Sequence, residues 1–282
     1  MAGSTTASLD DLLPAIVAEA QFVASERSIM RGLVKNYNLG AGQGKTVTVP
    51  VYPKQTAAGL TEGQEISNTE IATTSSILTV STVALRTLVT DLARNQSASN
   101  VVADVGRLFG EAIARKIDAD LMGKFSEFTT NTVGSTTSTI SAATVFQAVA
   151  KLKAAGYDTM DMACVLHPAI AYDLKANLTN TFANPNGGDL QNEAMRAGFV
   201  GMLAGVPVYE TGNMANNGTA GDFVGGVFHR DALGLALVGD IAIETQRRAS
   251  YLGDDIVGYA HYGVGTLQEA AGVAVSADSS IL

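Results

Sequence analysis

Residues 96–125, QSASNVVADVGRLFGEAIARKIDADLMGKF, have the pattern of one long amphipathic helix around which the rest of the chain is organised. Its apolar residues recur with the helical period and form one broad stripe: Val101, Val102, Val105, Leu108, Phe109, Ala112, Ile113, Ile117 and Leu121. The opposite side carries the charged residues Asp104, Arg107, Glu111, Arg115 and Asp118. Ser97 or Ser99 suits the N-cap position. At about 1.5 Å per residue, this helix would be roughly 40 Å long and would act as a beam for the rest of the chain.

The apolar stripe predicts which side of this helix is buried. Leu108 falls inside the stripe, so we expect Leu108→Asp to destabilise the fold by on the order of several kcal/mol. Lys116 and Asp120 interrupt the stripe. The charged side would face solvent or a neighbouring copy, and Arg107 and Arg115 are therefore candidate contacts between copies.

A long two-stranded arm is predicted before this helix. Residues 46–52 alternate between apolar and polar positions like a strand, and residues 77–85 form an answering strand. The connection between them spans residues 53–76, and connections longer than roughly 15 residues are unusual inside a compact domain unless they are functional. Because an isolated strand pair is marginal in water, we expect the arm to dock on another surface; a mobile surface loop is the alternative. Its candidate contact residues are Lys54, Glu62, Glu65 and Glu70.

The remaining segments predict a mixture of helices and strands. Helices are expected at residues 10–34, 142–155, 168–178 and 189–197, with Gly156 as the stop of the second. Strands are expected at residues 162–166, 199–203, 206–210, 223–228, 241–245, 256–264 and 273–275. Residues 85–94 have the pattern of a short helix or turn. Residues 129–139 have the composition of a Ser/Thr-rich linker.

The amino-acid composition excludes several classes of protein. The chain has 282 residues, 46% of them hydrophobic, which is enough for a substantial core. A net charge of −9 and the lack of a Lys/Arg run argue against tight non-specific nucleic-acid binding. No apolar run approaches the roughly 18 residues of a membrane span, and no signal peptide is visible. We therefore expect a protein that is made in the cytoplasm and has no membrane partner.

The sequence offers no candidate catalytic, cofactor or metal site. Cys164 lies in an apolar run and is expected to be a buried thiol. The three histidines share no ligand spacing. The glycine-rich turn at residues 40–46 lacks the spacing of a phosphate loop and leads into a strand. The pair Asp254-Asp255 has the ordinary interpretation of solubility or capping, and Arg247-Arg248 is too short for a nucleic-acid patch.

The order of these parts resembles the major capsid protein of tailed bacteriophages, with the Hong Kong 97 type fold. Residues 201–214, GMLAGVPVYETGNM, are similar to the late segment of that family's axial A-domain. Residues 165–168, VLHP, followed by Tyr172 and Leu174, resemble its step from strand through proline to helix. Residues 254–264 and 269–275 resemble its returning and terminal strands. The resemblance covers nearly the whole chain.

This resemblance implies an α+β phage major-capsid fold with four parts. They are an N-arm at residues 1–45, an extended E-loop at 46–85, a P-domain with a long spine helix at 86–139 and 241–282, and an A-domain at 140–240. Subunits of this family assemble as hexamers and pentamers into an icosahedral shell around double-stranded DNA. An acidic subunit suits this role, because a wall that gripped DNA would hinder packaging and release.

The implied partners are further copies of the chain, a separate scaffolding protein, a portal, a decoration protein and packaged DNA held without sequence preference. The implied location is the virion, assembled in the host cytoplasm. Lys54 lies on the arm, but nothing identifies a crosslinking partner for it, so crosslinking is not predicted. An encapsulin-type nanocompartment shell protein is the first alternative. An α/β enzyme spanning residues 140–240 is the second.

Overall fold

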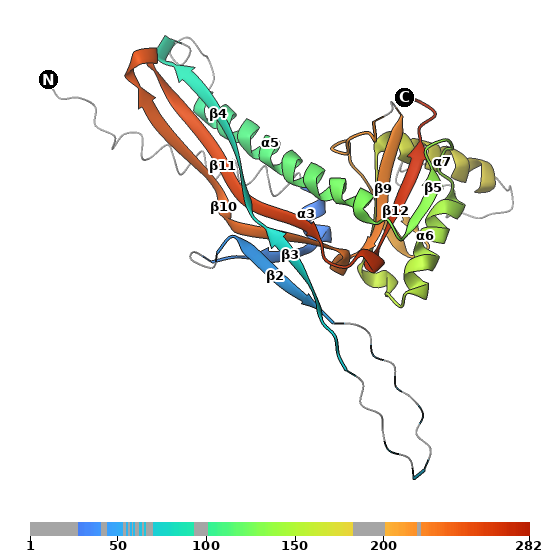
Figure 1. The fold of residues 1–282 in the computed structure, drawn as a ribbon. Helices are drawn as coiled ribbons and strands as arrows, with labels where there is room; N and C mark the ends of the chain where they lie inside the picture. Colours follow the sequence, from blue (N-terminus) through green and yellow to red (C-terminus); the bar gives the residue numbers. More distant parts are fainter. Residues whose placement is uncertain are drawn as a thin grey trace.

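The computed structural model describes residues 28–40, 44–52, 55, 57, 59, 62, 63, 65, 70–92, 101–182, 201–218 and 221–282. Within them a four-stranded sheet has the strand order β1-β10-β11-β4, a six-stranded sheet has the order β5-β12-β9-β6-β8-β7, and β2 pairs with β3. Figure 1 shows the long four-stranded sheet, with helix α5 running beside it, extending from the more compact six-stranded sheet. The predicted α+β class is confirmed.

The four-stranded sheet is built on one long hairpin. Strands β10 (Leu233–Arg248) and β11 (Gly253–Thr266) pair antiparallel along their length, with a register shift between Val238 and Ala242. Strand β4 (Ser81–Thr90) pairs antiparallel with the other edge of β11. The short β1 (Lys35–Asn38), which follows helix α3 (Met30–Leu33), runs parallel to the start of β10. The β10–β11 hairpin joins neighbouring segments, whereas β1 and β4 reach its two edges from distant parts of the chain.

Helix α5 (Val101–Gly123) confirms the long predicted helix and continues into a 3₁₀ turn, η1 (Lys124–Glu127). Its apolar face packs on the long sheet, where Phe109 joins a cluster with Val89, Ile243 and Ile256. A Cβ added to Gly258 of β11 would lie 2.6 Å from the Phe109 ring. A glycine at this position is therefore what lets the helix approach the strand closely.

The predicted stripe of α5 was too broad. Leu108 is 60% exposed, whereas Phe109, Ile113, Ile117 and Leu121 are buried. Because neighbouring helical residues lie about 100° apart, burial centred on the line from Phe109 to Leu121 turns Leu108 outward. The prediction that Asp118 lies on the solvent side is also wrong, because this residue is 1% exposed. The expected N-cap at Ser97 or Ser99 lies outside the described residues.

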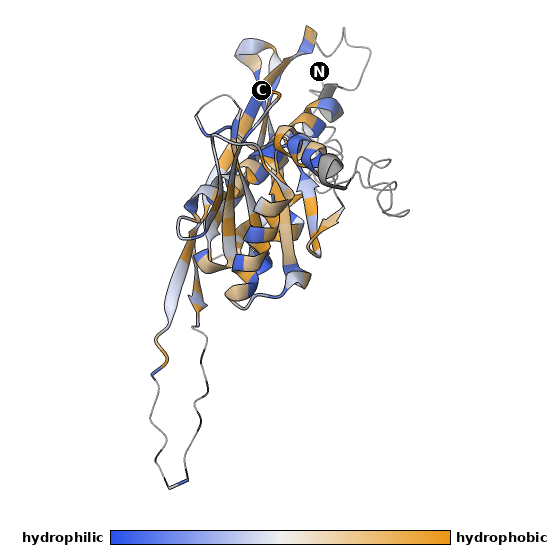
Figure 2. Ribbon diagram, turned by 90° about the vertical axis from the view of Figure 1, so that its right-hand side faces the viewer, coloured by the Kyte–Doolittle hydropathy of each residue, from blue (hydrophilic) through white to orange (hydrophobic). Residues whose placement is uncertain are grey.

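The six-stranded sheet carries the main core. Its strands are β5 (Thr132–Ser135), β6 (Met162–Leu166), β7 (Met202–Leu203), β8 (Val206–Glu210), β9 (Asp222–His229) and β12 (Gly272–Asp278). Helices α6 (Ala142–Ala154) and α7 (Pro168–Phe182) lie beside it. Every residue of β6 is buried, as expected for a central strand flanked by β9 and β8. Figure 2 shows hydrophobic and hydrophilic residues alternating along strands and around helices, which is typical of elements with one buried side.

Three predictions about strand boundaries are corrected. The expected strand at residues 77–85 is two strands, β3 (Thr74–Thr79) and β4, which divide at Val80. Residues 85–90 belong to β4 and are not a helix or turn, since alternate side chains of β4 turn toward α5 and the core. The Ser/Thr-rich segment 129–139 contains β5, which pairs parallel with β12 at the sheet edge.

Other predictions are confirmed or fall outside the described residues. Strand β2 (Thr46–Val51) has the predicted alternation, and α6 is followed by Gly156 at φ 79°, a conformation that favours glycine. The predicted helix at residues 189–197 and most of the one at residues 10–34 are outside the described part of the chain.

Candidate interaction surfaces

The connection between β2 and β3 is the first candidate surface. The two strands pair antiparallel from Thr46↔Thr79 to Val51↔Thr74. The pair itself packs on the long sheet, where Leu78 of β3 joins a buried cluster with Ala236 and Leu267 (Figure 1). Every described residue between them, residues 52–73, is exposed, including Glu62, Glu65 and Glu70. Lys54 lies outside the described residues. The described part of this connection therefore has little support from its own protomer.

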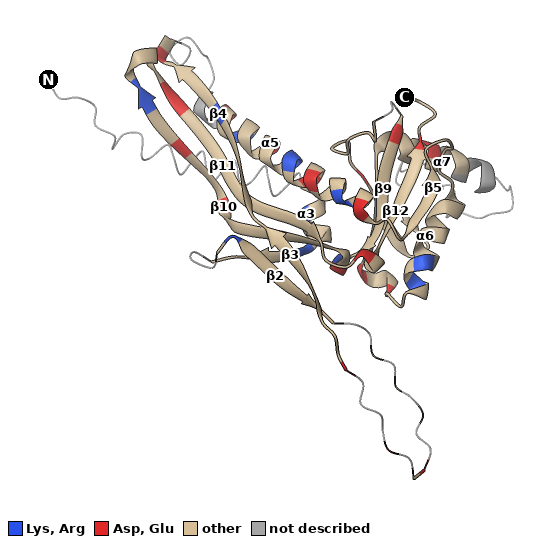
Figure 3. Cartoon of the chain, in the orientation of Figure 1, with Lys and Arg blue, Asp and Glu red and all other residues tan. Residues whose placement is uncertain are grey.

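The exposed side of α5 is the second candidate surface. Arg107 Nε lies 3.7 Å from Glu111 Oε1, and Arg115 Nη2 lies 3.8 Å from Glu111 Oε2, so the structure brings both predicted arginines around one carboxylate. The two arginine side chains are 56% and 61% exposed. Leu108 is exposed on the same helix. Figure 3 shows acidic and basic residues following one another along α5, so this side of the helix has no strong net charge.

A third group of charges lies at the far end of the long hairpin and was missed by the sequence analysis. Arg247 binds both carboxylate oxygens of Asp91 at 2.6 Å and also contacts Asp254 at 3.4 Å. Asp254 and Asp255 are 4% and 3% exposed, so the interpretation of this pair as a solubility or capping feature was wrong. Arg247-Arg248 and Asp254-Asp255 flank one hairpin turn. Two opposite-charge pairs at that spacing could have indicated from the sequence that they form ion pairs across the hairpin.

Asp255 binds two arginines on different strands. Arg86 Nη2 and Arg248 Nε contact the same oxygen, Oδ2, at 2.8 and 2.7 Å. The other oxygen, Oδ1, is buried and has no hydrogen-bond partner. Around the turn, Tyr251 and Leu252 are 58% and 68% exposed. The hairpin end thus combines exposed apolar side chains with a dense set of charges.

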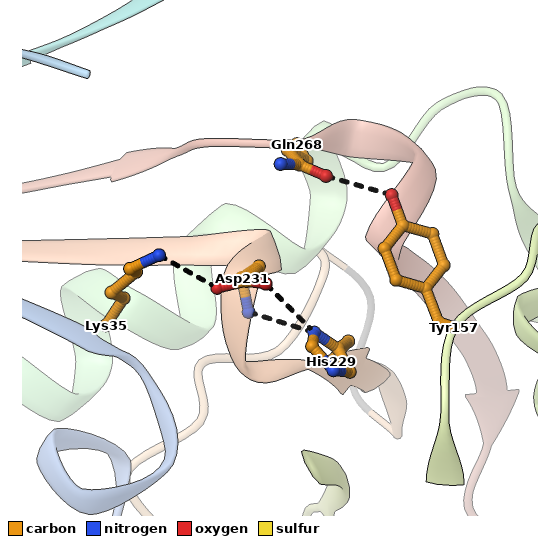
Figure 4. A network of polar contacts seen from close by, with 5 residues as sticks. All are labelled: Lys35, Tyr157, His229, Asp231 and Gln268. Atoms are coloured by element: carbon orange, nitrogen blue, oxygen red, sulfur yellow. Dashed lines mark hydrogen bonds and ion pairs between the residues drawn. The ribbon is translucent and has the colours of Figure 1, made fainter. Parts of the chain in front are cut away.

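A polar network joins the two large sheets (Figure 4). Asp231, between β9 and β10, lies 3.1 Å from the ammonium of Lys35 and 3.6 Å from Nδ1 of His229. Tyr157 donates a hydrogen bond of 2.9 Å to Gln268, which precedes β12. Burial and the nearby Asp231 carboxylate raise the pKa of Tyr157, so its hydroxyl stays a donor. The network fixes the point where the chain passes from one sheet to the other.

Asp118 anchors the start of the described chain to α5. Its carboxylate accepts hydrogen bonds from the hydroxyl of Ser28 at 2.8 Å and from the backbone N–H of Ile29 at 3.2 Å. Burial raises the pKa of Asp118, and these hydrogen bonds oppose the rise. A hollow of about 220 Å³ lies next to this contact, between Arg31, Ile117, Asp240 and His261. This buried carboxylate therefore ties the segment to the helix, together with Met30 and Val34, which are buried in the same core cluster as Ile113 and Ile117.

The side chains that could act as a nucleophile or a base, Cys164 and His167, lie in structural environments. Cys164 is fully buried, and burial raises the pKa of its thiol to about 12. His167 stacks on Phe223 with ring centroids 3.8 Å apart and accepts a hydrogen bond from the N–H of Ala169. Burial lowers the pKa of His167, so the ring is neutral near neutral pH. Among the described residues no helix is both long and apolar enough to cross a membrane.

Comparison with known proteins gives one family and a set of similar structures. A family model described as "Phage capsid protein" matches residues 73–276. The capsid of cyanophage P-SCSP1u aligns with a TM-score of 0.70 at 16% identity, over 90% of this chain and 89% of that chain. Mycobacterium phage Che8 aligns with a TM-score of 0.69 at 18% identity, over 88% and 91%. An encapsulin complex from Synechococcus elongatus aligns with a TM-score of 0.63 at 9% identity, over 90% and 88%. No curated protein matches the sequence.

Proposed function

Since the chain belongs to the phage capsid protein family and is a major capsid structural protein, we propose that its copies join through the β2–β3 connection to close a shell. The observation that carries this proposal is the exposure of every described residue from 52 to 73. A second copy that covers the connection would supply the burial that its own protomer does not.

We propose the parts of the subunit as follows. Residues 1–45 form the N-arm and residues 46–85 the E-loop. Residues 86–139 and 241–282 form the P-domain, and residues 140–240 form the A-domain. The sheets support two changes to these ranges. Strands β5 and β12 pair in the same sheet as β9 of the A-domain and are counted with it, and the whole of β10, from Leu233, is counted with the P-domain. The long sheet with α5 then forms the P-domain, and the junction around Asp231 connects the two.

The shell would assemble from hexamers and pentamers in the host cytoplasm, with a separate scaffolding protein, a portal and a decoration protein as further partners, and would become part of the virion. It would enclose double-stranded DNA without sequence preference. The net charge of −9 supports a wall that does not hold DNA tightly. Membership of the phage capsid protein family supports a structural and not a catalytic role.

The test shortens the connection without touching either strand. Val51 and Thr74 are register partners, so residues 52–73 can be replaced by an Asn-Gly turn that closes the hairpin directly. The expected result is a folded protomer, measured by circular dichroism, that forms no closed shells in negative-stain electron microscopy. Normal particles from this variant would refute the docking role.

An encapsulin-type shell is the second candidate, and the shared fold with the Synechococcus elongatus encapsulin complex favours it. The two functions differ in what surrounds the gene and what fills the particle. Terminase, portal and scaffolding genes beside this one support the phage capsid. A neighbouring gene for a peroxidase or ferritin-like protein, together with particles filled by that protein, supports the encapsulin.

A further inference from the structure

Arg86 and Arg248 form a positively charged pair that shares one buried carboxylate. Both contact Oδ2 of Asp255, at 2.8 and 2.7 Å, and the Asp255 side chain is 4% exposed. The two arginine side chains are 53% and 40% exposed. Each guanidinium has five N–H donors, and the contact with Asp255 joins one nitrogen of each arginine to the carboxylate. One buried negative charge therefore holds two positive charges at the surface.

Strand register builds this pair on one side of the long sheet. Asp255 lies opposite Leu88 in β4 and Gln246 in β10, so Arg86 and Arg248, each two residues along, share its side. Gly258 faces the Phe109 ring of α5, so residue 255, three positions away on β11, points away from the helix. The pair lies on the sheet face that is turned away from α5.

The sheet face that carries Arg86 and Arg248 is exposed, and contacts on it hold the arginine side chains in place. Its neighbouring side chains, Leu88 and Gln246, are exposed. The guanidinium of Arg248 also lies over the ring of Tyr251, 5.9 Å from its centroid, which adds a second restraint on its position. A guanidinium held in place loses little conformational freedom when it binds a carboxylate, so the pair is preorganised for an anionic partner.

We propose that Arg86 and Arg248 receive the acidic side chains Glu62, Glu65 and Glu70 from the β2–β3 connection of a second copy. All three glutamates are exposed, and in residues 53–73 they outnumber the single basic residue, Lys54. Arginine pairs with carboxylates through matching planar forks. This inference rests on the proposed docking of the connection and names its receptor.

The test exchanges the charges across the interface. The connection variant carries Glu62→Lys, Glu65→Lys and Glu70→Lys, which lie on exposed positions where the protomer fold does not depend on them. The receptor variant carries Arg86→Glu, Arg248→Glu and Asp255→Asn, where the last change prevents three carboxylates from crowding. Each variant alone should lower the fraction of protein in shells at least about tenfold, because like charges then face each other. Combining both sets should restore shells. Sedimentation and electron microscopy measure the yield.

Two controls keep the outcome interpretable. Lys153→Glu on α6, at an exposed position, also makes the subunit more acidic far along the chain and should leave shell yield unchanged. If the receptor variant does not fold, Arg248→Glu alone, which keeps Arg86 paired with Asp255, replaces it in the same exchange.

The inference is overturned if the combined variant fails to restore shells, if the connection variant assembles normally, or if the α6 control loses shells as well. It is also overturned if receptor variants form normal shells that hold less DNA, since the arginines would then bind phosphate. If shortening the connection abolishes shells while the charge exchange has no effect, only this inference falls and the proposed function stands.

Discussion

Phe125 lies in η1, directly after α5, and packs against the six-stranded sheet. Its contacts predict that Gly226→Ala destabilises the protein when Phe125 is present and stabilises it when Phe125 is replaced by alanine. The side chain is fully buried, with its ring centroid 5.3 Å from that of Phe228 in β9. A Cβ added to Gly226, also in β9, would lie 2.7 Å from the Phe125 ring. The ring therefore occupies the space that any larger residue at position 226 would need.

The magnitudes follow from these contacts. Phe125→Ala should cost about 3–5 kcal/mol of unfolding free energy through lost burial and a residual cavity. Gly226→Ala should cost about 1–3 kcal/mol, because its methyl group would overlap an aromatic ring held on several sides. In the Phe125→Ala background that overlap is gone. Gly226→Ala should then stabilise by about 0.4–1 kcal/mol, since alanine restricts the unfolded chain more than glycine does.

The assay is urea unfolding of the unassembled protein, followed by far-ultraviolet circular dichroism because the chain has no tryptophan. Gly212→Ala is the matched control, since a Cβ at Gly212 meets nothing within 4 Å. It should have the same small effect in both backgrounds. An equal cost of Gly226→Ala with and without Phe125 would refute the close packing of α5 on this sheet.

Three further predictions use α5 and the core. Leu108→Asp should change the unfolding free energy by about 0.5 kcal/mol or less, whereas Ile113→Asp, at a fully buried position, should cost several kcal/mol; equal costs in urea unfolding would contradict the observed burial. Burial raises the pKa of Asp118 above its usual 3.8, so the folded state keeps a proton that the unfolded state releases, and stability should fall as pH rises between the two pKa values, by at most about 1.4 kcal/mol per pH unit. Asp118→Asn should remove this slope in melting curves taken across the acidic range, and an unchanged slope would assign it to another group. Cys164 should react with a thiol reagent only on unfolding, because its thiol is buried and has a pKa of about 12; full labelling of the folded protein within minutes would show that β6 opens.

Local elements with a strong side-chain period could be predicted from the residues alone. The alternation of residues 46–51 predicted β2, the apolar run at residues 162–166 predicted the buried β6, and Gly156 marked the end of α6. The long helix was also predictable, because its apolar period persists over many turns. The order of these elements carried the resemblance to phage capsid proteins, and the family match over residues 73–276 agrees with it.

Which sides of these elements are buried, and which distant charges meet, depends on how the elements pack together. Leu108 and Phe109 are both apolar and adjacent, but only Phe109 finds a glycine beneath it, Gly258, so the helix turns Leu108 outward. Asp118 can be buried because Ser28 and Ile29, far away in the sequence, donate hydrogen bonds to its carboxylate. Periodicity cannot report such partners, because burial is a property of the surface that an element meets and not of the element alone.

The same reason applies to the strands and to the arginine pair. Residues 132–135 become a strand because β12 offers them an edge, not because of their composition. Arg86 and Arg248 come from widely separated segments, and only the register of β4, β11 and β10 brings both to Asp255. Period and turn chemistry act over a few residues and are written in the sequence, whereas these contacts exist only after the sheet has formed.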